Sequence, residues 1–191
     1  MNPNDHFDRR FSKVWTRSVK YLSDERGYFL EYFRQSLIGN FDLNFIQDSV
    51  SFSQKSVLRG LHVQENQWQL STLLHGTVQY FILDIDPNSD DYLKLETIAL
   101  SAEGITQVLA APGIAHGFFA ESSEVVMSYK NSTYYENTLQ HGINFSSFDG
   151  MKNIMSHSIR SKRDTDFLEI SEVLGDSTFK EYQSSISVQN P

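Results

Sequence analysis

The chain has 191 residues, of which 39% are hydrophobic and 21% are charged, a composition typical of one soluble globular domain with a buried core. Its formal net charge is −8 and it contains no long Lys/Arg tract, which argues against a nucleic-acid surface. No cysteine is present, so disulfides, thiol nucleophiles and thiolate metal ligands are excluded. Residues 1–10 are polar, and no segment approaches the roughly 20 apolar residues of a membrane span. We therefore expect a cytoplasmic protein with no membrane partner.

Short β-like runs separated by turn residues follow one another along the chain, at the spacing typical of a sandwich or barrel. Turns are expected at residues 39–40, 75–76, 86–90 and 111–113, where Gly, Pro, Asn, Asp or Ser gather. The longest dense apolar stretch, residues 81–85, has the length of a strand. The pattern predicts strands at residues 14–22, 27–32, 45–52, 57–63, 70–74, 77–85, 94–99, 106–110, 116–120 and 125–130.

One convincing helix is expected, at residues 165–174, with Gly175 as its end. Because helix-length segments do not separate the strands, an alternating α/β fold fits poorly. The sequence predicts an all-β fold: an antiparallel β-barrel with a short C-terminal helical segment. We expect a single domain over residues 1–191, with its core at about 14–174 and a frayed tail at about 184–191.

Two of the six histidines lie in runs that suggest a functional site. His62 follows Arg59 and Gly60 in a strand-like run, and His116 follows the tight turn at residues 111–113. Residues three apart on a regular strand point to opposite faces, but a bulge at Gly60 would turn Arg59 and His62 toward one cavity. An exposed arginine and an ordinarily packed histidine are the alternative, which composition alone favours.

Other kinds of catalytic site find little support in the sequence. The position two after His62 is Gln64 and the position two after His116 is Phe118, so a His-x-His metal site is not formed, and we expect no metal and no cofactor. Nucleophile-elbow, phosphate-loop and dinucleotide motifs are also missing. Proton transfer by His, Tyr and Asp side chains remains, and that chemistry alone names no substrate.

An ordered set of short runs resembles the dTDP-4-dehydrorhamnose 3,5-epimerase family of cupin-fold nucleotide-sugar epimerases. The runs are DERGYFLE, FIQDSVS, VLRGLHVQ and APGIAHGF, followed by Tyr129 with Tyr135 six residues on, and SKRD at residues 161–164. Together they extend from about residue 14 to 174. The LRGLH and AHGF runs are specific when they occur together at this separation. The resemblance implies a cupin-type jelly roll and a homodimer that exchanges an N-terminal strand.

The resemblance also implies a proton-transfer reaction at a 4-keto-6-deoxyhexose linked to a nucleotide. A C4 ketone acidifies the hydrogens on C3 and C5, so a base can remove one, and an acid on the opposite face can return it. His62 matches the base, Asp164 the residue that holds its imidazole, and Tyr129 the acid. For Asp164 the alternative is a helix N-cap, with Asp166 able to cap instead, and for Tyr129 it is a packed strand aromatic.

The remaining matches concern the nucleotide and the sugar. Arg26 and Arg59 match positions that meet the diphosphate, Phe29 an aromatic that stacks on the base, and Glu31 a carboxylate that accepts from a pyrimidine. Thymine and cytosine can both donate a hydrogen bond to Glu31, so the sequence does not decide between dTDP and CDP as the nucleotide. The other substrate-binding residues that the resemblance implies are Gln47, Asp48, Gln69, His116 and Tyr135.

Three departures from the family pattern bear on the reaction. Gln69 aligns with a lysine that stabilises the enolate, Tyr80 with the aspartate that pairs with it, and Asp48 with an asparagine. The positive charge of the lysine and the negative charge of the aspartate are lost together, so no unpaired charge is left in the cavity. The weaker oxyanion stabilisation favours inversion at C3 alone, although inversion at both C3 and C5 stays open.

Three functions are carried forward from the sequence. The first is an epimerase of deoxysugar biosynthesis that supplies a surface polysaccharide of the O-antigen type. The second is a 3,4-ketoisomerase of the same fold, which the run at residues 59–64 does not match. The third is a non-catalytic binder of sugar nucleotides, which the loss of the Lys–Asp pair favours and the presence of His62, Tyr129 and Asp164 disfavours.

Overall fold

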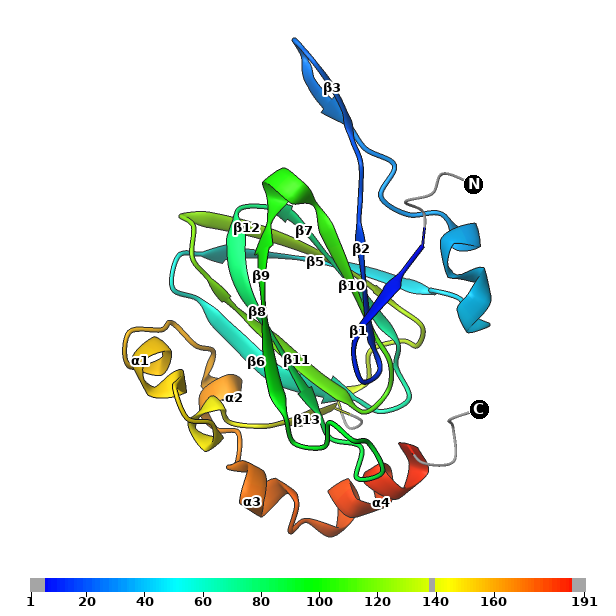
Figure 1. Ribbon diagram of the computed structural model, residues 1–191. Helices are drawn as coiled ribbons and strands as arrows, with labels where there is room; N and C mark the ends of the chain where they lie inside the picture. The colour runs from blue at the N-terminus through cyan, green and yellow to red at the C-terminus, as the bar shows by residue number, and fades with distance from the viewer. Residues whose placement is uncertain (1–5, 138–139, 187–191) are drawn as a thin grey trace.

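The computed structural model describes residues 6–137 and 140–186 of the chain. Two antiparallel sheets face each other to form a barrel (Figure 1). The six-stranded sheet has the order β1-β2-β10-β7-β12-β5, and the five-stranded sheet has the order β13-β6-β11-β8-β9. In the six-stranded sheet the strands are β1 Asp8–Phe11, β2 Val14–Ser18, β10 Thr106–Ala110, β7 Gln69–His75, β12 Glu124–Asn131 and β5 Gln47–Gln54. In the five-stranded sheet they are β13 Gln140–Gly142, β6 Leu58–Gln64, β11 Ile114–Ala120, β8 Thr77–Asp84 and β9 Leu95–Ser101.

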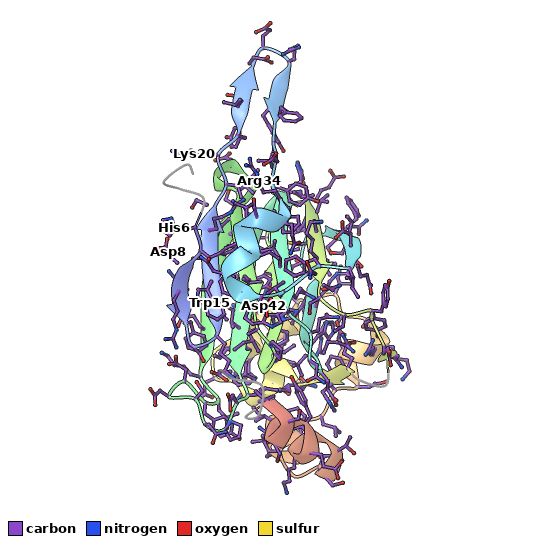
Figure 2. The ribbon with its side chains drawn as sticks, turned by 90° about the vertical axis from the view of Figure 1, so that its right-hand side faces the viewer. His6, Asp8, Trp15, Lys20, Arg34 and Asp42 are labelled. Carbon is purple, nitrogen blue, oxygen red and sulfur yellow. The ribbon has the colours of Figure 1, made fainter. Side chains whose placement is uncertain are left out.

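The predicted all-β class and the antiparallel barrel are confirmed, and most predicted strands are found within a few residues of their expected limits. The predicted run 14–22 divides into β2 and β3 (Leu22–Asp24). With β4 (Gly27–Phe29), β3 makes a hairpin that projects beyond the barrel (Figures 1 and 2). Strands β1 and β13 were not predicted. Both are short, and each is held by pairing with one neighbouring strand, β2 or β6.

The predicted helix at residues 165–174 is wrong as a single element. Its region holds two short helices, α2 (Lys162–Thr165) and α3 (Ile170–Val173). Between these helices the backbone is hydrogen-bonded to Asn144. The backbone N–H of Asn144 donates to the Leu168 carbonyl at 2.9 Å, and its side chain donates to the Phe167 carbonyl at 3.0 Å. These long-range bonds hold the backbone out of a helix.

The helical segment is also longer than the sequence predicted. Helices α1 (Met151–Ser156) and α4 (Ser177–Ile186) were both missed, and α4 includes the start of the tail expected at 184–191, whose residues 187–191 lie outside the described part of the chain. Figure 1 shows α1 to α4 following one another along the side of the barrel formed by the five-stranded sheet. None of the helices within residues 6–137 and 140–186 has the length and apolar character that crossing a membrane requires.

The central strands β8 and β11 of the five-stranded sheet are buried on both faces. Along β8, Val78, Tyr80 and Ile82 point into the barrel, whereas Phe81 and Leu83 point to the helical layer, where they pack with Phe145 and Phe179 among others. A strand covered on both faces needs apolar residues at successive positions, which explains the dense apolar stretch at residues 81–85.

The outer face of the six-stranded sheet is covered at one end by a 3₁₀ helix, η1 (Gln35–Phe41), which the sequence did not predict. Figure 2 shows η1 lying over the strands between the labelled Arg34 and Asp42, with Trp15 beside its lower end. The Phe41 ring packs edge-on against Trp15 and Trp68, with centroids 5.1 and 5.7 Å away. This contact fixes the chain between the projecting hairpin and β5.

A bulge in β6 is the local feature that shapes the barrel interior. His116 pairs with His62 and Phe118 pairs with Arg59, so the one residue of β11 between these pairs lies opposite two residues of β6. Gly60, with φ of 106°, takes the extra position. A Cβ atom there would lie 2.7 Å from Gly117 Cα and from the His116 carbonyl oxygen. Only glycine fits at this position.

We predict that Gly60→Ala lowers the free energy of unfolding by about 2–4 kcal/mol, because it adds a steric clash to an unfavourable φ. Chemical denaturation measures this change. Gly39→Ala is the matched control, since its Cβ would meet nothing within 4 Å, and we expect it to be nearly neutral. Equal stability of the two variants would contradict the role assigned to the bulge.

Candidate active site

A cavity of about 240 Å³ opens between the two sheets, at the end of the barrel where its lining turns polar. Tyr80 and Phe118 separate it from the apolar core. Of the described residues that line it, Arg59 carries the one permanent positive charge and none carries a carboxylate. In a chain with a net charge of −8, this makes the cavity an unusually favourable place for an anionic ligand. The lining residues are Gln47, Ser49, Ser51, Arg59, His62, Gln67, Gln69, Tyr80, His116, Gly117, Phe118, Tyr129, Asn131, Tyr135 and Gln140.

The bulge at Gly60 turns Arg59 and His62 to the same side of β6, as the sequence predicted. Both side chains line the cavity. Leu58, Leu61 and Val63 point to the opposite face, where they belong to the apolar cluster beneath the helices. Without the extra residue the alternation of the strand would send one of the two polar side chains into that cluster.

His62 is held by a carboxylate that comes from 102 residues further along the chain. Its Nε2 lies 2.8 Å from Asp164 Oδ1, and the backbone N–H of Gly60 donates to Asp164 Oδ2 at 3.4 Å. Since a carboxylate accepts, the proton of the neutral imidazole resides on Nε2 and Nδ1 is left as the basic nitrogen. The Phe167 ring meets the imidazole edge to face, with centroids 5.4 Å apart.

Two local features bring Asp164 to this position. The segment before α2 runs beside the start of β6, where Leu58 N–H donates to the Ile159 carbonyl at 2.9 Å. Ser161 then precedes helix α2, and its hydroxyl caps the helix by accepting from Asp164 N–H at 3.0 Å. Glu169 is the N-cap of α3, so the N-cap roles considered for Asp164 and Asp166 are both wrong, and the Asp164 carboxylate is available to His62.

The charge of Asp164 is stabilised despite its burial. Burial opposes ionisation, but hydrogen bonds from His62, Gly60 N–H and Ser161, with the electrostatic effect of His62, outweigh it and lower the pKa of Asp164 below its ordinary value. Asp164 is only 6% exposed, so this carboxylate is shielded from solvent while it holds the imidazole.

Tyr129 enters the cavity from β12, in the sheet opposite His62. Its hydroxyl lies 3.0 Å from Ser51 Oγ on the adjacent strand. Burial raises the pKa of Tyr129 to about 12, against the smaller opposing effects of Ser51 and Arg59. The phenol therefore remains protonated at neutral pH and is suited to donate a proton.

His116 also lines the cavity as a neutral group. Burial lowers its pKa to about 4, with a further contribution from His62. Its ring stacks parallel to Tyr80, with centroids 6.3 Å apart and an angle of 7° between the planes. Its Nδ1 is buried and has no hydrogen-bond partner among the described residues.

Several predicted binding residues stand at the mouth of the cavity or on its walls. The Gln47 side-chain oxygen accepts from Tyr135 N–H at 2.6 Å. Tyr135 in turn accepts at its hydroxyl from Arg163 at 2.7 Å. Arg59 donates to Ser53 Oγ and to the Phe52 carbonyl, so it is oriented without being neutralised by these neutral partners. Gln69 lies on the wall formed by β7.

Four predicted binding residues lie outside the cavity of their own chain. Asp48 points to the outer face of β5, where both its carboxylate oxygens accept from Lys130, at 2.8 and 2.9 Å. Gln47 and Ser49, on either side of Asp48, take the positions that face the cavity, so substrate binding by Asp48 stays a prediction. Arg26 and Phe29 are on the projecting hairpin, with Arg26 paired to Asp24, and Glu31 follows it, paired to Arg34.

The sequence did not single out the amides and hydroxyls that complete the cavity wall. Polar residues at every second position of β5, and Asn131 two residues after Tyr129, were the available signals. No pattern in the sequence indicated that Gln67 or Gln140 would line the cavity. No group of three or more His, Cys, Asp or Glu side chains that could hold a metal ion occurs among residues 6–137 and 140–186. The residues missed are Ser49, Ser51, Gln67, Asn131 and Gln140.

Comparisons with known proteins agree on one family. The sequence model of the family described as dTDP-4-dehydrorhamnose 3,5-epimerase matches residues 9–172. An enzyme of that name from Methanothermobacter thermautotrophicus is 35% identical over 125 residues, or 63% of this chain and 68% of its own. A dTDP-4-dehydrorhamnose 3-epimerase from Streptomyces niveus is 30% identical over 137 residues, or 68% of this chain and 66% of its own. The alignments thus span about two thirds of each relative.

The structure has a close counterpart among solved proteins. A dTDP-6-deoxy-D-glucose-3,5-epimerase from Legionella pneumophila, crystallised with dTDP-4-keto-L-rhamnose, superposes with a TM-score of 0.79 at 26% identity. The superposition covers 91% of this chain and 97% of that one. It confirms the cupin-type fold that the sequence predicted.

We predict that the stability contributed by Asp164 depends on pH. Because its folded-state pKa is lowered, the contribution is complete above the ordinary value of about 3.9 and is lost as pH falls through the lower folded value. The difference in free energy of unfolding between the unmodified chain and Asp164→Asn should therefore be constant above about pH 4 and narrow as pH falls from about 4 to 2. Asp166→Asn, at an exposed carboxylate paired with Lys162, is the control. A difference that stays constant over this range would contradict the assignment.

Proposed function

Since this chain belongs to the dTDP-4-dehydrorhamnose 3,5-epimerase family, we propose that it is an isomerase that epimerises a nucleotide-linked 4-keto-6-deoxyhexose. The observation that carries the proposal is the pairing of His62 with Asp164 at 2.8 Å, on the wall of a cavity that Tyr129 enters from the opposite sheet. A base and an acid on two sides of one cavity are what inversion of a carbon centre requires.

The reaction begins when His62 Nδ1 removes the proton from the carbon beside the C4 ketone. The electrons of the C–H bond form a carbon–carbon double bond, and the ketone oxygen becomes the enolate oxyanion. Asp164 stabilises the imidazolium through Nε2–H. Tyr129 then donates its phenolic proton to the opposite face of the same carbon, which restores the ketone and inverts the centre. Proton exchange with solvent returns His62 and Tyr129 to their starting states.

The nucleotide is placed by charge and by the projecting hairpin. Arg59 supplies the positive charge that a diphosphate needs. Phe29 is 77% exposed on a hairpin that reaches beyond its own barrel, and Val50 and Phe52 expose apolar surface on edge strand β5. We infer a homodimer in which Arg26, Phe29 and Glu31 complete the partner's site. The names of the relatives favour dTDP over CDP as the nucleotide.

The wall around Gln69 bears on how many centres are inverted. Inversion of both C3 and C5 requires an enolate that survives while the sugar is re-seated. Gln69 and Tyr80 are neutral, so the oxyanion receives less stabilisation than an ammonium group would give. We propose that C3 is inverted much faster than C5. The product serves deoxysugar biosynthesis in the cytoplasm, for a surface polysaccharide of the O-antigen type.

We predict that the protein exchanges the C3 hydrogen of dTDP-4-keto-6-deoxy-D-glucose for deuterium in deuterated water, as followed by NMR. His62→Ala should abolish exchange while nucleotide binding survives. Tyr129→Phe should slow product formation more than deuterium wash-in, because His62 still removes and returns a proton on its own face. Rapid labelling at C5 would contradict the single-centre proposal. Absence of any label would indicate a non-catalytic binder, and a 3-keto product would indicate a ketoisomerase.

We predict that the hairpin acts in the partner's site. Arg26→Ala and His62→Ala should each be inactive, yet mixing the two should restore up to about a quarter of the normal activity, since one site of each mixed dimer is intact. Light scattering at micromolar concentration measures the dimer directly. A monomer, or a mixture no more active than its components, would contradict the shared site.

A further inference from the structure

Four neutral side chains form a continuous hydrogen-bonded chain along the cavity wall. The Tyr80 hydroxyl lies 2.9 Å from Ser71 Oγ, Ser71 Oγ donates to Gln69 Oε1 at 3.1 Å, and Gln69 Nε2 donates to Asn131 Oδ1 at 3.1 Å. Gln69, Tyr80 and Asn131 line the cavity, whereas Ser71 lies behind them and is 1% exposed. This series of hydrogen bonds joins three strands, β8, β7 and β12, across both sheets.

The series of hydrogen bonds from Tyr80 to Asn131 has a defined direction. A serine hydroxyl has one proton, and Ser71 gives it to Gln69, so Ser71 accepts from Tyr80. The carboxamide of Gln69 is thereby oriented, with its oxygen toward Ser71 and its nitrogen toward Asn131. Only one of its two N–H groups is used by Asn131. The other N–H belongs to a side chain on the cavity wall and is available to a ligand oxygen.

Tyr80, the first donor of this hydrogen-bonded series, is held in place by burial and keeps its proton. Its ring is 1% exposed within the apolar core and stacks on His116. Burial raises the pKa of Tyr80 well above its ordinary value, so its proton is retained. Every member of the chain is then neutral at working pH, and the donor presented to the cavity is an oriented dipole rather than a cation.

We propose that Gln69 donates its free N–H to the ketone oxygen as that oxygen becomes the oxyanion, and that Tyr80 is the positioning residue that orients Gln69 through Ser71. This inference rests on the epimerase function proposed above. A donor that is already oriented needs no reorganisation when charge develops, which is the condition under which a neutral group stabilises an oxyanion well. The sites of proton removal and of charge stabilisation then lie on different strands, β6 and β7.

The test compares kcat and KM of the variants with those of the unmodified protein on dTDP-4-keto-6-deoxy-D-glucose, over pH 5 to 9. Tyr80→Phe keeps the ring but removes the donor to Ser71, and kcat should fall roughly 5–20-fold with KM within about twofold. Gln69→Glu keeps the shape but loses the N–H, and kcat should fall about 10²–10³-fold at neutral pH. The carboxyl group that this substitution introduces would donate again once protonated, so the activity of the variant should rise toward low pH. A purely structural role would not produce that change of profile.

Tyr182→Phe is the matched control. Tyr182 is as buried as Tyr80, at 2% exposed, and its hydroxyl accepts from Gly113 N–H at 3.1 Å, but it lies in the cluster beneath the helices and not at the cavity. It should lose stability without loss of kcat. If Tyr80→Phe does not fold, Ser71→Ala breaks the same link without changing an aromatic ring, and its kcat should fall similarly.

The outcomes separate this inference from the proposed function. An unmodified protein that exchanges no deuterium with the substrate would overturn the function itself. Exchange by the unmodified protein, together with a Tyr80→Phe kcat within twofold and a Gln69→Glu pH profile parallel to the unmodified one, would overturn the positioning role alone. The predicted fall in kcat, with the acid-shifted profile, supports both.

Discussion

The hydrogen bond between Asp164 and His62 is the interaction on which the site depends, because it joins the helical layer to the barrel at the residue that we propose as the catalytic base. The same carboxylate accepts from the backbone of Gly60, so it holds the bulge as well as the imidazole. The bulge in turn decides that Arg59 and His62 face the cavity together. A buried carboxylate left without these donors would be costly, so the fold and the orientation of the base stabilise each other.

The electrostatic character of the cavity depends on the absence of carboxylates from its described lining. The protein is acidic, yet the carboxylates near the cavity are turned away or paired: Asp48 with Lys130 on the outer face, and Asp164 with His62 behind the wall. The remaining described lining is neutral except for Arg59, and His116 and Tyr129 are held neutral by burial. The proposed anionic substrate and intermediate would therefore meet dipoles and one cation, with no competing negative charge on the described wall.

Local patterns in the sequence predicted the parts of this account that depend on neighbouring residues. Strand alternation and Gly60 were enough to predict the barrel and the shared direction of Arg59 and His62. The interrupted helix at residues 165–174 could not be predicted, because its backbone bonds to Asn144 are long-range. Alternation along β5 turns Asp48 away from the cavity of its own chain, to the face where it pairs with Lys130. The chain from Tyr80 to Asn131 joins three strands, and nothing in the separate segments indicates that they meet.

Nitrogen-15 NMR of the His62 imidazole tests most directly whether Asp164 sets the base for proton removal. We predict that, in the neutral imidazole of the unmodified protein, the proton resides on Nε2 and Nδ1 is the unprotonated nitrogen. In Asp164→Asn the imidazole should lose this single tautomer. A proton found on Nδ1 in the unmodified protein would contradict the account, since the nitrogen left free would then face Asp164 instead of the substrate.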